Sequence, residues 1–227
     1  MQRYLIESNG PNKDAAMLML QEAFRICQRE RMSRITLVVP NKATFPSTPV
    51  GELLGDGVRR LCQGKTLALS EDLSLELVCA SKSQNFYGYD LIVAVYLSLD
   101  ALYKFDTDMS AKAILFLPWM EEEGKQWLAT RNPTILGANT WQVQQTSLPL
   151  EVVSALSALS SGINLSTGLA HPEDRKTVRE VLRRLRDSGH LLCSTDVKNW
   201  ALKNGWPLDG ANDFATEVAS IFKSGCV

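Results

Sequence analysis

The chain has 227 residues, a formal net charge of -1 and 22% charged residues. Because neither sign of charge dominates, the totals exclude a protein that is drawn to nucleic acid or to an anionic membrane by its overall charge. No apolar run approaches the roughly 20 residues that cross a bilayer. We therefore expect no membrane-spanning segment and a cytoplasmic protein.

Cysteines are scattered along the chain, and no two of them are close in sequence. An odd number of cysteines without a C-x-x-C pair argues against a disulfide framework and against a structural zinc site. We expect reduced, mostly buried thiols. They are Cys27, Cys62, Cys79, Cys193 and Cys226.

The first sixty residues predict two strands, each followed by a helix. Residues 4–6 form a short apolar strand that ends at a turn containing Gly10 and Pro11, and Asn12 is placed to cap the helix that follows. Residues 35–39 form the second strand. Pro49 suits the first turn of the next helix, in which three glycines favour close packing or a bend.

Two apolar runs in the middle of the chain, residues 91–95 and 113–117, show no polar alternation. Such runs are typical of strands buried on both faces, and the short crossover at 99–106 implies that they are parallel. Residues 66–69, 75–79 and 134–136 are further strand candidates. We therefore expect a three-layer, mostly parallel, Rossmann-like α/β domain.

Strand signals stop after residue 142, and helical patterns take over. A helix is expected from Pro149, a small polar linker at 164–168, and then three helices that start near residues 172, 194 and 210. We place the Rossmann-like domain at residues 1–165 and an all-helical module at residues 168–227. A bundle of that size is near the lower limit for independent folding, so we expect it to contact the sheet domain or a protein partner.

Ligands of open parallel sheets bind outside the carboxyl ends of the strands. Ser8 and Asn9 follow the first strand at the position where a dinucleotide-binding fold has its glycine-rich turn. The G-x-G-x-x-G pattern is absent, because Gly10 is the only glycine in this turn. A plain turn is the competing interpretation.

The loop after the second strand offers a lysine, an amide and hydroxyls just before a helix. Helix N-terminal amides and an ammonium group together favour an anion, so this loop could hold a small anionic or nucleotide-like ligand. Alternatively, its hydroxyls only cap the helix, and its lysine is only solvated. The candidate residues are Asn41, Lys42, Thr44, Ser47 and Thr48.

Other chemistry has weaker support in the sequence. His171 and His190 lie outside the predicted sheet domain, so we expect no metal site there. The helix at 172–187 carries a basic face that could contact phosphates, but acidic residues share the helix and disfavour nucleic-acid binding. Its candidate residues are Arg179, Arg183, Arg184 and Arg186.

These patterns lead to three hypotheses about function. The first is a binding or interaction module that holds a small anionic or nucleotide-like ligand at the carboxyl edge of the sheet, with a protein partner for the C-terminal helices. The second is an enzyme acting on a nucleotide or phosphorylated substrate, with Lys42, Asp90 or Asp100 in polar roles. The third is a nucleic-acid-associated regulator that uses helix 172–187. All three depend on analogy between folds, which host many functions.

Overall fold

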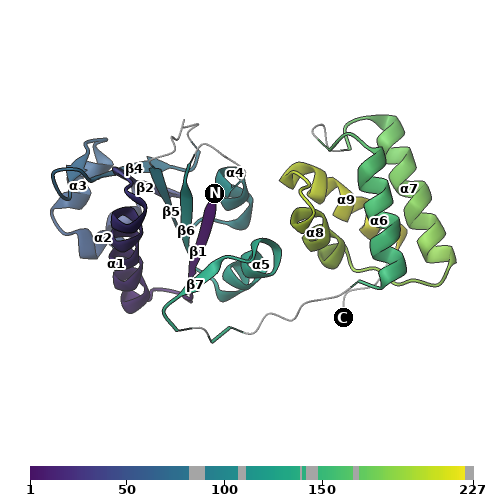
Figure 1. Cartoon of the computed structure of the whole chain (residues 1–227), viewed down its shortest axis with the longest axis horizontal. Helices are drawn as coiled ribbons and strands as arrows, with labels where there is room; N and C mark the ends of the chain where they lie inside the picture. Colours follow the sequence, from purple (N-terminus) through teal and green to yellow (C-terminus); the bar gives the residue numbers. More distant parts are fainter. Residues whose placement is uncertain (82–89, 107–110, 139, 142–147, 166–168, 223–227) are drawn as a thin grey trace. The chain divides into compact units, whose positions relative to one another are not determined.

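The computed structural model describes residues 1–81, 90–106, 111–138, 140–141, 148–165 and 169–222 (Figure 1). It has two compact units, Met1–Leu128 with Asn132–Val143, and Gln144–Val227 with Ala129–Arg131. The sequence predicts a boundary at 165–168, whereas the main segments of these units meet at residues 143–144. Part of the expected linker, residues 166–168, lies outside the described residues. No helix in the described ranges is long and apolar enough to cross a membrane.

A single sheet organises the N-terminal unit. Its order in the described residues is β3-β4-β2-β5-β6-β1-β7, and every neighbouring pair is parallel except β3 and β4. The strands are β1 (Gln2–Ile6), β2 (Arg34–Val39), β3 (Leu67–Ala68), β4 (Ser74–Cys79), β5 (Asp90–Val95), β6 (Ala113–Leu117) and β7 (Thr134–Leu136). The predicted mostly parallel α/β fold is confirmed.

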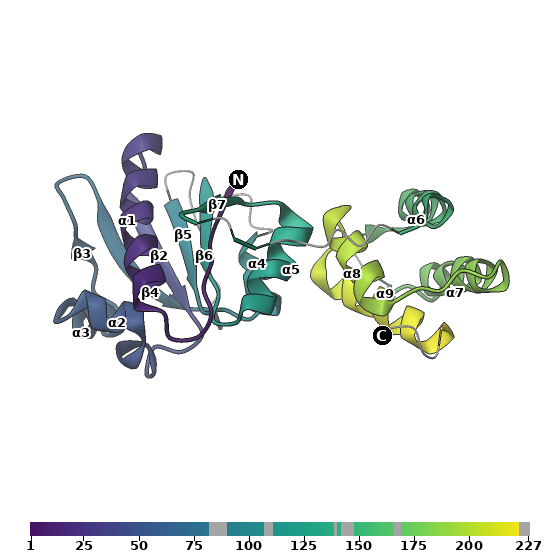
Figure 2. The same ribbon diagram turned by 90° about the horizontal axis from the view of Figure 1, so that it is seen from below.

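Helices cover both faces of this sheet, so the unit has three layers with the sheet in the middle (Figure 2). One face carries α1 (Lys13–Glu30), the 3-10 turn η1 (Phe45–Ser47), α2 (Pro49–Leu54) and α3 (Gly57–Cys62). The other face carries α4 (Leu99–Asp106) and α5 (Glu121–Arg131). The two sides follow from right-handed crossovers, because β1 and β2 connect toward one edge of the sheet while β5 and β6 connect toward the other.

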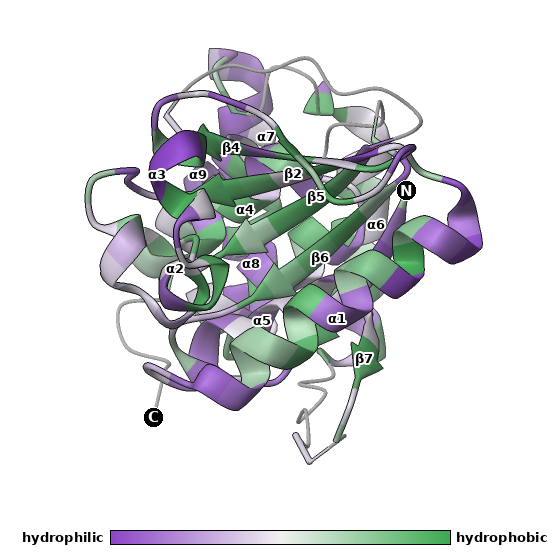
Figure 3. Ribbon diagram, turned by 90° about the vertical axis from the view of Figure 1, so that its left-hand side faces the viewer, coloured by the Kyte–Doolittle hydropathy of each residue, from purple (hydrophilic) through white to green (hydrophobic). Residues whose placement is uncertain are grey.

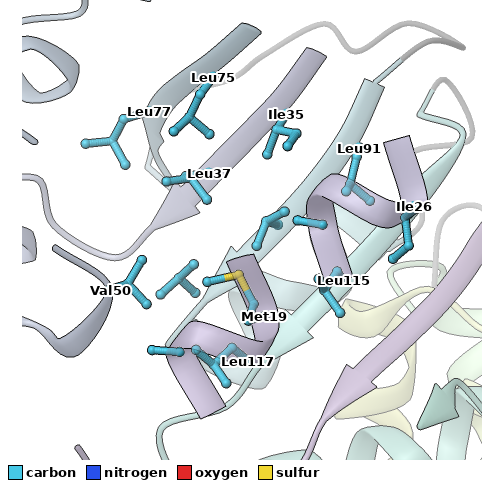
Figure 4. Close-up of a cluster of buried hydrophobic side chains, with 14 of the residues drawn as sticks. Met19, Ile26, Ile35, Leu37, Val50, Leu75, Leu77, Leu91, Leu115 and Leu117 are labelled. Carbon is cyan, nitrogen blue, oxygen red and sulfur yellow. The ribbon is translucent and has the colours of Figure 1, made fainter. Parts of the chain in front are cut away.

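Every residue of β5 and β6 is buried, and Figure 3 shows most of both strands as hydrophobic. Alternate side chains face the two helical layers. On one side Met19 and Ile26 of α1 lie over residues such as Leu115 (Figure 4). On the other side Phe116 meets Trp127 of α5 edge to face, with ring centroids 5.5 Å apart. Burial of this apolar area on two sides is the main stabilising term of the unit.

Local signals at the helix ends explain where the helices begin and end. The Asn12 side chain accepts a hydrogen bond from the Ala15 N–H at 2.9 Å and caps α1, as the sequence predicts. One helix was expected after Pro49, but the chain forms α2 and α3 with a break at Gly55, whose φ is +54°. A left-handed residue stops the helical hydrogen-bond ladder, and glycine adopts it at little cost.

Polar side chains join the three strands β4, β2 and β5 near their start. Arg34 donates two hydrogen bonds to the fully buried Asp90, at 2.7 and 2.8 Å. Thr36 donates to Glu76 at 2.7 Å. Each pair consists of residues directly opposite each other in the sheet. A buried carboxylate is tolerated here because a bidentate guanidinium satisfies it.

The C-terminal unit contains α6 (Leu150–Gly162), α7 (Pro172–Asp187), α8 (Ser194–Lys203) and α9 (Leu208–Ile221). The Trp206 ring stacks on Phe214 with centroids 4.8 Å apart, and its N–H donates to the Ser160 hydroxyl of α6 at 2.9 Å. The helix predicted from Pro149 therefore packs with the three later helices.

Three cysteines, Cys27, Cys62 and Cys79, are free thiols, as the sequence predicts. Cys226 lies outside the described residues. The cytoplasmic location stays a prediction.

We expect Gly51→Ala to lower the free energy of unfolding by about 2 kcal/mol or more. Gly51 is buried in α2, and an added Cβ would overlap the backbone carbonyl of Phe45, which cannot move as a side chain can. Chemical denaturation would measure the loss. Glu52→Ala, an exposed change in the same helix, should alter stability by less than about 0.5 kcal/mol. Equal effects of the two changes would contradict this packing argument.

Stability should fall in alkaline solution because of Cys27. Burial raises the pKa of its thiol from 9.0 to about 12. Above pH 9 the unfolded chain therefore ionises first, and stability is lost by up to about 1.4 kcal/mol per pH unit until pH passes the folded pKa. Tyr96 adds to the loss above pH 10, since burial raises its pKa to about 12.

Denaturant unfolding at several values between pH 8 and 10.5 measures this slope. Cys27→Ala should flatten it. A Cys27→Ala slope equal to that of the unmodified protein would show that this thiol does not cause the loss.

Candidate functional site

Two pairs of neighbouring strands send their crossovers to opposite faces of the sheet. One pair is β2 and β5, and the other is β6 and β1. Loops part at such switch points, and ligands of open α/β sheets bind there. The predicted Lys42 loop lies at the first pair. The predicted Ser8–Asn9 turn lies at the second, where the Gly10 N–H donates to the Trp119 carbonyl at 2.6 Å and bridges the two loops.

A cavity of about 380 Å³ opens beside the Ser8–Asn9 turn, between the ends of β1 and β7 and the first turns of α1. Its volume is at the lower end of the range of small-molecule sites in proteins. Apolar and polar side chains both line it. The lining residues are Ile6, Glu7, Ser8, Asn9, Asn12, Asp14, Ala15, Leu18, Leu136, Ala138, Thr140 and Trp141.

Ser8 is the most unusual member of this lining. The residue is only 4% exposed, and its Oγ has no hydrogen-bond partner among the described residues. It precedes α1, whose first N–H groups have no acceptor within the helix. A buried hydroxyl without a partner costs about 1–3 kcal/mol. A ligand that reached this oxygen would supply the missing bond.

Glu7 holds the far wall of the cavity in place. Its carboxylate accepts hydrogen bonds from the Thr140 N–H at 2.9 and 3.0 Å, from the Thr140 hydroxyl at 2.6 Å and from the Trp141 N–H at 2.8 Å. We call residues 140–141 the wall segment. Hydrogen bonds to an ionised acceptor are among the stronger ones, so Glu7 fixes where the wall segment lies.

The ring of Trp141 packs where α5 has no side chain. A Cβ added at Gly124 would overlap this ring and would lie 3.0 Å from the Pro118 ring. Gly137, at the end of β7, has φ +88°, and a Cβ there would lie 2.6 Å from Leu18. Two glycines thus let the Trp141 ring pack on α5 and let Leu18 of α1 pack against the end of β7.

The electrostatic character of the cavity is acidic. Asp14 lies in the first turn of α1, is exposed, and forms no ion pair within the described part of the chain. The positive end of the helix dipole favours a carboxylate at that position. Among the described residues, the cavity lining contains Glu7 and Asp14 and no lysine or arginine.

An aromatic pair lies at the ends of the central strands β5 and β6. Tyr96 has φ +57° without being glycine, and its ring meets that of Trp119 edge to face at 5.0 Å. Trp119 is 40% exposed. A non-glycine residue in this conformation costs roughly 1–3 kcal/mol and is frequent near functional sites, but neither ring lines the cavity.

The Lys42 loop uses its hydroxyls on its own backbone. Thr48 caps α2 through the Gly51 N–H at 3.2 Å, and Ser47 donates to the Thr44 carbonyl at 2.8 Å. Thr44 donates to the Asn41 carbonyl at 3.4 Å, and the Asn41 side chain accepts from Ala43. The ammonium of Lys42 forms no ion pair in the described ranges. These contacts are those of the capping alternative.

The remaining candidates lie elsewhere. Asp90 is paired with Arg34 inside the sheet, and Asp100 lies in the first turn of α4. On α7, Arg179 donates two hydrogen bonds to Glu217 of α9, at 2.6 and 3.0 Å, and Arg186 pairs with Asp187. Arg183 and Arg184 form no ion pair within the described helices. Among the described residues no group of three His, Cys, Asp or Glu side chains could hold a metal ion.

Comparison with known proteins gives one finding. A family model described as "Domain of unknown function (DUF1889)" matches residues 151–225, about a third of the chain. This segment contains nearly all of α6 and the whole of α7, α8 and α9, and none of the cavity residues. No curated protein and no solved structure matches the chain.

Sequence reasoning found part of this site and missed the rest. Ser8 and Asn9 were identified by their place after the first strand. The loop from Gly137 to Thr140 was also expected at this edge of the sheet. Asp14 and Trp141 were not identified, because Trp141 reaches Glu7 only through the pairing of β7 with β1. The Gly137 turn after a short strand was the one local signal that pointed to the wall.

We expect Gly124→Ala to displace the Trp141 ring and to lower the free energy of unfolding by about 1–3 kcal/mol. In an open helix the same change stabilises by up to about 1 kcal/mol. Gly162 in α6 offers that control, since a Cβ there would meet nothing within 4 Å. Two results would contradict this packing of the Trp141 ring. One is a Gly124→Ala variant that loses no more stability than Gly162→Ala. The other is an equal loss of stability from Gly124→Ala in a chain that already carries Trp141→Ala.

Proposed function

We propose that the N-terminal unit is a small-molecule-binding domain, and that its ligand is nucleotide-like in size and lies in the cavity between β1, β7 and α1. The observation that carries this proposal is the Ser8 hydroxyl, which is buried, lacks a partner and lies beside the N-terminus of a long helix. Position supports it as well, because the cavity lies at the carboxyl edge of a parallel sheet, next to a switch point.

The cost of leaving the Ser8 hydroxyl unsatisfied in the unliganded protein supports a binding role. An unsatisfied hydroxyl destabilises the folded state, and natural proteins retain such groups where function requires them. A ligand that accepts or donates at Ser8 recovers this loss on binding. The first N–H groups of α1 and the side chain of Asn9 provide further polar contacts along the same rim.

The wall segment gives the site a defined shape. Glu7 holds Thr140 and Trp141 through four hydrogen bonds, so the cavity exists before a ligand arrives. A preformed cavity reduces the conformational entropy that the site loses when a ligand binds. The turn at Ser8 has one glycine, so it offers no glycine-rich cradle for the pyrophosphate of a dinucleotide. We therefore propose a mononucleotide-sized ligand.

Ser8→Ala tests this proposal through two opposite effects. In the absence of ligand the variant should be more stable by about 1 kcal/mol, because the unsatisfied hydroxyl is gone. Thermal unfolding of the full chain is then measured with a panel of nucleosides, nucleotides, sugars and sugar phosphates. A ligand at a hundred times its Kd stabilises by about 2.7 kcal/mol, and this shift should be much smaller in Ser8→Ala.

Two control variants locate the site. Ser47→Ala removes a hydroxyl that already has a partner, and Lys42→Ala removes the cation of the other switch-point loop. Both should keep the ligand-induced shift. Loss of the shift in Lys42→Ala but not in Ser8→Ala would move the site to the Lys42 loop. No shift with any compound of the panel would overturn the proposal.

A further inference from the structure

We infer that the ligand of this cavity is an uncharged, hydroxyl-bearing molecule such as a nucleoside, and not a phosphorylated one. The inference deepens the proposed function and rests on it. It concerns the charge that the cavity accepts, which the position of the site alone does not determine. It also differs from the expectation of an anionic ligand, which the carboxyl edge of such a sheet suggests from sequence.

The first step is the unneutralised charge on the rim. Asp14 lies in the cavity lining and has no cationic partner among the described side chains. The nearest cation in sequence, Lys13, pairs with Glu52 of α2 at 3.7 Å. A phosphate beside α1 would therefore meet an exposed carboxylate without a lysine or arginine to offset the repulsion.

The helix terminus does not reverse this preference. The partial positive charge at the N-terminus of α1 is about half of one elementary charge, and Asp14 in the same turn already carries a full negative charge. The Asn12 side chain already satisfies the Ala15 N–H, and its carbonyl accepts from Ala16. Two of the N–H groups at this terminus are therefore already occupied.

The second step is the kind of polar atom that the rim presents. The Asp14 carboxylate offers acceptor oxygens, and the amide of Asn9 and the hydroxyl of Ser8 can each accept as well as donate. Glu7 is different, because its oxygens are occupied by the wall segment. Acceptors in excess select a ligand with O–H or N–H groups. Vicinal hydroxyls of a sugar suit the Asp14 carboxylate, and an apolar ring suits the apolar lining residues such as Leu18 and Leu136.

Matched pairs of compounds test the inference on the full chain. Each pair contains one molecule with and one without phosphate: adenosine and AMP, uridine and UMP, ribose and ribose 5-phosphate. For the pair that binds, calorimetry at low salt should give a Kd for the uncharged member at least about tenfold below that of its phosphate. The difference should shrink as salt is added, because screening weakens the repulsion.

Asp14→Asn provides the matching variant, because it keeps an acceptor oxygen and removes the charge. It should reduce the ratio of the two Kd values in a pair several-fold, mainly because the phosphorylated compound binds more tightly. Asp56→Asn, which removes an exposed carboxylate at the start of α3, should leave the ratio unchanged. An equal effect of the two variants would show that net charge, and not Asp14, sets the preference, and would overturn the inference.

The outcomes separate this inference from the proposed function. If a phosphorylated compound binds tighter than its uncharged partner and the binding is lost in Ser8→Ala, the site stands and the inference fails. If the uncharged member binds tighter and Asp14→Asn removes the preference, both stand. If no pair binds, the proposed function fails, and the inference fails with it.

Discussion

The burial of β5 and β6 on both faces is the constraint on which the rest of the N-terminal unit depends. Two adjacent strands without an exposed residue cannot form the surface of a protein, so helices must cover the sheet on each side. Right-handed connections then send the chain toward one edge from β1 and β2, and toward the other from β5 and β6. The switch points, and the open end at Ser8, are consequences of this central apolar pair.

The charge of the chain as a whole and that of its cavity differ. A net charge of -1 spread over 227 residues gives little information about partners. The cavity, however, is lined by two carboxylates, and the described part of its lining holds no lysine or arginine. Their roles also differ, since Glu7 bonds to the chain and Asp14 faces solvent. A local imbalance of this kind selects ligands at short range without affecting the behaviour of the whole molecule in solution.

The sequence predicted the elements of this fold better than their arrangement. Apolar runs identified β5 and β6, and Asn12 marked the start of α1, because both signals act over a few residues. The strand order could not be predicted, since the pairing of β1 with β7 joins residues far apart in sequence. From the sequence, the Lys42 loop was the stronger of the two candidate loops. In the structure, Thr48 and Ser47 of that loop form hydrogen bonds to its own nearby backbone. Those hydrogen bonds depend on the backbone conformation of the loop, which its residue types do not reveal.

The bonds between Arg34 and Asp90 have a further meaning for how this sheet assembles. Strands made only of apolar residues can slide past one another by a residue or two with little loss of contact, which leaves room for folding errors. Arg34 and Asp90 lie directly opposite each other, so a displaced strand would bury one of them without its partner. Such a misaligned sheet would be penalised heavily. One ion pair at the start of the strands thereby selects the correct alignment from several that are almost equally apolar.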